Sequence, residues 1–170
     1  MRALLCSSGR ELSIPASTQV SENIKQEKDA GASTTNALVR RHLRIGWWGL
    51  LLFLAFGIAL EAMHGFKFGL YLDVSNEMRR LMWTLAHAHG TLFSLAQIAF
   101  AATLHILRDQ RSWQLTASRF LIAGTILVPG GFFLGGVYLY GGDPGMGVFL
   151  VPLGALFFFI GVFLTAKGTK

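Results

Sequence analysis

Two histidines stand two residues apart, as His87 and His89, inside the apolar stretch MWTLAHAHGTLF at residues 82 to 93. Imidazole nitrogens bind metal ions and haem iron, so this pair is the first candidate for chemistry. An α-helix turns by about 100° per residue, which sets the two rings about 200° apart. One straight helix therefore does not offer both rings to a single ion.

A second set of ligand-type residues precedes this pair. Glu61 and His64 are three residues apart and share one helix face. At a rise of about 1.5 Å per residue, Glu61 and His87 lie at about the same depth in an apolar layer. We expect Glu61, His64 and His87 to converge on one point near the outer face. Met63 and Met82 fall on the same side and add candidate thioether ligands.

These residue types predict a cofactor site. Imidazole together with thioether suits copper, and a Glu-x-x-His pair on a helix suits iron, manganese or zinc. A haem b is held by two histidines, and the candidates here are His64, His87 and His89. The first hypothesis is therefore a small accessory electron-transfer or metal-handling protein with a haem or copper site.

The same residues also have an interpretation without a cofactor. Ionisable side chains inside a membrane usually pair with one another, and Arg80 shares a face with His87. A polar network of Glu61, Arg80 and His87 would hold two helices together in a structural or interaction subunit of a membrane complex. A third hypothesis is proton or ion translocation along the polar stripe of the helix that carries His87. No nucleophile or phosphate-binding loop is evident, so we do not expect a classical enzyme.

Four apolar segments must position these side chains. Of 170 residues, 52% are hydrophobic and 14% charged, and the mean hydropathy is +0.49, which is too apolar for an ordinary soluble domain. A bilayer core needs about 20 apolar residues per helix. Residues 45–64, 81–107, 120–140 and 146–166 meet that length. We predict an all-α integral membrane protein, an antiparallel four-helix transmembrane bundle within residues 39–170.

Basic residues flank these segments unevenly. One side carries Arg40, Arg41, Arg44, Arg108, Arg111, Arg119, Lys167 and Lys170, and the other side carries Lys67, Arg79 and Arg80. The positive-inside rule then predicts that both termini are cytoplasmic, in a bacterial inner membrane. The net charge of +6 is explained in this way without a nucleic-acid partner.

The segment before the first span is polar. Residues 1–38 are rich in Ser, Thr, Glu, Lys and Gly with little periodicity, and we expect a disordered cytoplasmic tail. His42 lies among the basic flanking residues and is given no special role. The expected partners are the lipid bilayer and either other membrane subunits or further copies of the chain.

Overall fold

The computed structural model describes residues 16–72, 77–107 and 112–170, and these contain no strand. The elements are α1 (Ala16–Gly65), α2 (Gly69–Leu72), α3 (Glu77–Leu107), α4 (Trp113–Val137), the 3-10 helix η2 (Met146–Phe149) and α5 (Leu150–Gly168). Four helical segments are long and apolar enough to cross a membrane: Gln19–Gly65, Glu77–Leu107, Trp113–Val137 and Met146–Gly168. The prediction of an all-α chain with four such helices is confirmed.

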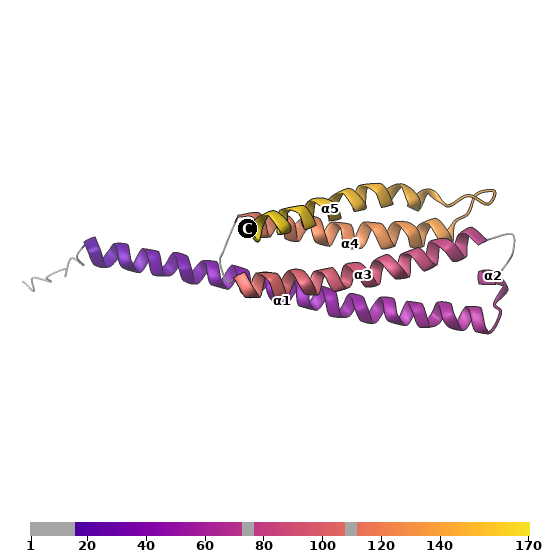
Figure 1. The fold of residues 1–170 in the computed structure, drawn as a ribbon, viewed down its shortest axis with the longest axis horizontal. Helices are drawn as coiled ribbons and strands as arrows, with labels where there is room; N and C mark the ends of the chain where they lie inside the picture. The colour runs from indigo at the N-terminus through magenta and orange to yellow at the C-terminus, as the bar shows by residue number, and fades with distance from the viewer. Residues whose placement is uncertain (1–15, 73–76, 108–111) are drawn as a thin grey trace, which may run out of the picture.

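The four long helices pack mainly in a row. α1 packs on α3, α3 on α4 and α4 on α5 (Figure 1). The share of buried residues in the most apolar part of each helix separates the outer from the middle helices. It is 11% for both α1 and the η2–α5 segment, but 39% for α3 and 44% for α4. The outer helices of the row therefore expose most of their surface, and the middle two hold the core.

The structure differs from the expectation that residues 1–38 are disordered. Residues 16–38 form the first part of α1, which extends well beyond the other helices (Figure 1). Residues 1–15 lie outside the described residues.

A packing stripe explains why this polar segment continues the helix. Gly31, Thr35, Leu38 and His42 recur every three or four residues and are all buried. Leu38 joins a buried cluster with Phe100, Leu104, Ala117 and Leu121 of α3 and α4. The stripe consists mostly of small and polar residues, so hydropathy alone does not reveal it.

Small residues allow close approach of α4 and α5. A Cβ added to Gly124 would lie 2.9 Å from the backbone oxygen of Gly154, so only glycine fits there without a backbone shift. Small residues at helix contacts are typical of helices that pack within lipid.

A tight turn connects these two helices. Tyr140 and Asp143 exchange two backbone hydrogen bonds of 3.1 and 2.9 Å across the turn. Its central residues, Gly141 and Gly142, have φ values of +58° and +95°, a conformation that favours glycine. The chain then returns along α4, and Gly168 at the end of α5 lies against Trp113 at the start of α4.

Candidate functional site

One pocket brings together Glu61 and His87, the pair on which the cofactor hypothesis depends. It lies between α1, α2 and α3, has a volume of about 370 Å³ and is mostly apolar. Its lining residues are Leu54, Gly57, Ile58, Leu60, Glu61, Tyr71, Thr84 and His87. The two residues thus share a cavity, as their positions along the two helices predict.

The backbone of α1 fixes the ring of His87. His87 Nδ1 lies 2.8 Å from the carbonyl oxygen of Phe53. A carbonyl oxygen only accepts, so Nδ1 carries a proton and donates it, and Nε2 is the nitrogen left for another partner. The ring also lies against Gly57, where an added Cβ would be 2.5 Å from Cε1. Gly57 is therefore needed for the imidazole to pack so closely against α1.

Glu61 is exposed and has no hydrogen bond or ion pair with any described residue. Arg80, its predicted partner, instead forms a 3.9 Å ion pair with Glu77 on its own helix, where the Arg80 side chain is 42% and the Glu77 side chain 71% exposed. Arg80 lines an adjoining pocket of about 460 Å³ with Tyr71 and Thr84. The structure thus does not show the predicted network of Glu61, Arg80 and His87, because the i,i+3 pair within α3 engages the guanidinium.

The other predicted ligands are dispersed. His64 is exposed, and its ring centroid lies 6.5 Å from that of Tyr71. Met63 is half-buried on α1. Met82 is buried and lies against the backbone of α4 at Gly135 and Gly136, away from the pocket with Glu61.

His89 points to a different neighbour from His87. Its Nδ1 donates to the carbonyl oxygen of Leu85 at 2.9 Å, and its ring centroid lies 5.0 Å from that of Phe132 on α4. The two rings therefore face different helices, as the angle between them predicts. Among residues 16–72, 77–107 and 112–170, no group of three or more His, Cys, Asp or Glu side chains is placed to hold a metal ion. Convergence of Glu61, His64 and His87 on one ion is not supported.

Sequence reasoning missed a chain of buried, hydrogen-bonded polar side chains between α1, α3 and α4. His42 and Gln97 have no exposed surface, and neither does Ser118. His42 Nδ1 is hydrogen-bonded to Gln97 Oε1, and His42 Nε2 lies 2.7 Å from Ser118 Oγ. Gln97 Nε2 donates to Thr125 Oγ1 at 2.7 Å, and Thr125 donates in turn to the carbonyl oxygen of Leu121 at 2.8 Å.

These bonds form one directed chain across three helices. The Gln97 oxygen only accepts, so His42 donates from Nδ1, and Nε2 accepts from the Ser118 hydroxyl. The chain thus runs from Ser118 through His42 and Gln97 to Thr125. It joins α1, α3 and α4, and every member has a partner. Satisfied buried networks of this kind fix the register of packed helices.

The dismissal of His42 as a flanking residue was therefore wrong. The extension of α1 carries this ring over α3, where it packs edge-to-face on Phe100 with centroids 4.6 Å apart. Gln97 could have indicated this network from the sequence. An amide side chain within an apolar span is costly unless it has hydrogen-bond partners, so its presence predicts polar partners on neighbouring helices.

Comparisons with known proteins do not assign the site. No protein-family model, curated protein or solved structure matches the chain.

Proposed function

We propose that the protein is a cofactor-free structural or interaction subunit of a membrane complex and that α1 is its docking helix. The observation that carries the proposal is the exposure of α1. In its apolar part, Trp48 is 67% and Leu51 58% exposed, although α1 packs on α3 along one stripe. Trp and other large apolar side chains are common anchors of protein interfaces.

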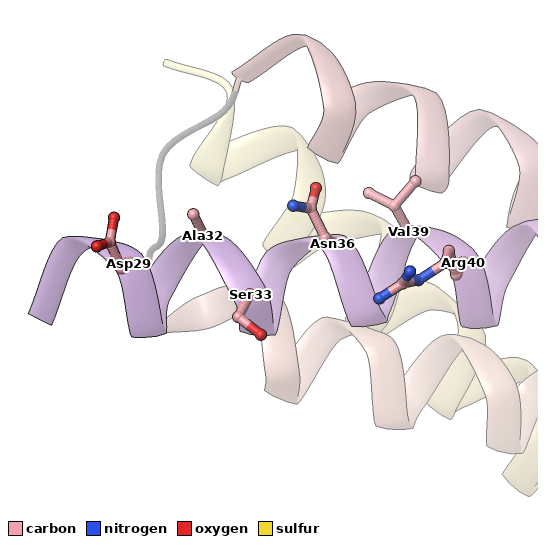
Figure 2. A pocket seen from close by; sticks show the side chains of 6 residues that line it. All are labelled: Asp29, Ala32, Ser33, Asn36, Val39 and Arg40. Atoms are coloured by element: carbon pink, nitrogen blue, oxygen red, sulfur yellow. The ribbon is translucent and has the colours of Figure 1, made fainter. Parts of the chain in front are cut away.

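The part of α1 that precedes its apolar segment supports the same role. A helix of 50 residues is about 75 Å long, against about 30 Å for a bilayer core. A shallow hollow of about 500 Å³ is lined by Asp29, Ala32, Ser33, Asn36, Val39 and Arg40. Figure 2 shows these six side chains along α1. All six belong to α1 and all except Val39 are exposed, so this flank of the helix is largely open. A partner on this open flank would stabilise the segment further, since only the opposite stripe of α1 is buried.

The proposal includes a topology. The four helices cross a bacterial inner membrane as an antiparallel bundle with both termini in the cytoplasm. Exposed Arg40, Arg41 and Arg44 support this orientation. Lys167 lies near the end of α5, which returns to the start of α4. Arg108 and Arg111, also part of the prediction, lie outside the described residues.

Co-purification from native membranes tests the docking role. We expect the tagged protein to retain a partner, or further copies of itself, in mild detergent. Trp48→Ala with Leu51→Ala should reduce the retained partner by about tenfold or more, because each interface anchor contributes above about 1 kcal/mol. The matched control is Phe159→Ala with Phe163→Ala, which removes two exposed aromatic side chains from α5. Equal recovery in both double variants would contradict a docking role for α1.

A second candidate, a haem or copper site, is favoured by one observation. His87 and His89 each donate Nδ1–H to a backbone carbonyl. Such a bond is common among histidines that bind metals, because it fixes the ring and leaves Nε2 for the metal. A Soret band or stoichiometric copper in the purified protein, lost on replacement of His87 by Ala, would support this candidate. A colourless, metal-free preparation from metal-replete cells would reject it.

A further inference from the structure

We propose that the pocket between α1, α2 and α3 binds the ammonium group of an aminophospholipid. The first argument is charge. Glu61 lies in a pocket whose walls include Leu54, Ile58 and Leu60, and no described residue pairs with its carboxylate. The Glu61 side chain is exposed on a helix that is apolar enough to span a membrane, so it would lie against lipid there, where a carboxylate requires a counter-charge. The pocket therefore fits a cation.

Hydrogen-bonding capacity identifies the kind of cation. A primary ammonium has three N–H donors and no acceptor. Four residues that line the pocket carry groups able to accept such bonds: Glu61 has a carboxylate, Thr84 and Tyr71 have hydroxyl groups, and His87 keeps Nε2 because its Nδ1 is bonded to Phe53. A bare metal ion is usually held by three or more ligands, and the described residues contain no group of three His, Cys, Asp or Glu side chains placed to hold one. A primary ammonium matches this donor and acceptor pattern better.

The surroundings of the pocket point to a lipid as the molecule that carries the ammonium. Leu54 and Ile58, which line the pocket, are largely exposed and face the region where acyl chains would lie. The adjoining pocket shares Tyr71 and Thr84 and adds Arg80, whose guanidinium suits a phosphate. Glu77 pairs with Arg80 at 3.9 Å and would have to share it. The two pockets together present a carboxylate and a guanidinium to a zwitterionic headgroup.

Native mass spectrometry of the purified full-length protein with added lipids tests the proposal. The probes are phosphatidylethanolamine, phosphatidylcholine and phosphatidylglycerol with identical acyl chains. Phosphatidylcholine has no N–H donor, and phosphatidylglycerol has no cation. We expect phosphatidylethanolamine to be retained roughly tenfold better than either, because only its ammonium group can donate charge-assisted hydrogen bonds to the Glu61 carboxylate.

Two variants identify the residue responsible. Glu61→Gln should abolish the preference for phosphatidylethanolamine, and Glu27→Gln, which removes the same charge from an exposed position of α1 that lines neither pocket, should keep it. Thermal unfolding of both variants checks that the fold is unchanged, which the exposure of both side chains leads us to expect. A preference that survives in Glu61→Gln, or equal retention of the three lipids by the wild type, would overturn the proposal.

A further arm distinguishes a lipid from a soluble amine. Octylamine is added to lipid-free protein in detergent. If octylamine binds in a Glu61-dependent manner and phosphatidylethanolamine does not, the pocket takes a soluble amine and the lipid assignment is wrong. Because α1 docking is measured by co-purification with Glu61 intact, either proposal can fail without the other.

Discussion

The hydrogen bonds of His42 use both nitrogens of a fully buried ring. Loss of the ring would leave the Gln97 oxygen and the Ser118 hydroxyl without their partner in a buried place. A buried polar group that loses its partner costs about 1–3 kcal/mol. At the scale of residues, the His42 ring is therefore expected to contribute to stability through both of its nitrogens.

Replacement of His42 by Ala is expected to lower the free energy of unfolding by about 2–4 kcal/mol, because two polar partners and a ring contact are lost. Reversible denaturation in mixed micelles measures the change. The control is His105→Ala, since His105 is exposed and should change stability by less than about 0.5 kcal/mol. Similar changes in the free energy of unfolding for both variants would show that the hydrogen bonds of His42 contribute little to stability.

Helical spacing predicts part of the candidate site. It places Glu61 on the same face as Gly57 and at the level of His87, and the structure has all three in one pocket. It does not predict that Gln97 meets His42 and Thr125. Those contacts depend on how α3 packs between two other helices, which local periodicity does not specify.

At the scale of elements, glycine contacts set the distance between α4 and α5. Gly124 faces the backbone of α5, whereas an added Cβ at Gly130 would meet nothing within 4 Å. The two positions lie on the same helix, so they separate the effect of close packing from that of helix propensity.

Gly124→Ala is expected to destabilise the protein by about 1–3 kcal/mol, since α5 must move away from the new methyl group. Gly130→Ala should be neutral or stabilising by up to about 1 kcal/mol, because alanine favours a helix more than glycine does. Thermal unfolding in one detergent compares the two. A larger loss for Gly130→Ala would contradict the described contact of α4 with α5.

The extents of the elements were predicted unequally. The predicted span at residues 81–107 ends where α3 ends, because apolar length is a direct signal. The start of α1 was not predicted, since Gly31 and Thr35 are buried without raising the hydropathy of the segment. Apolar length thus identifies the part of a helix that suits lipid but not the part that packs on protein beyond it.

At the scale of the whole molecule, the row of helices has two outer members with unequal lengths. α5 and η2 together cover residues 146–168, whereas α1 covers residues 16–65 and projects beyond the rest (Figure 1). Both outer helices expose large apolar side chains. The docking proposal distinguishes them, because only α1 also offers a flank outside the apolar layer.

Site-specific photo-crosslinking in intact membranes tests this distinction most directly. A photoreactive phenylalanine analogue is placed at Leu51 of α1 or at Phe159 of α5, which are 58% and 67% exposed. We predict a discrete protein adduct from position 51 and only lipid adducts from position 159. Lipid adducts alone at position 51 would contradict the claim that α1 docks a partner.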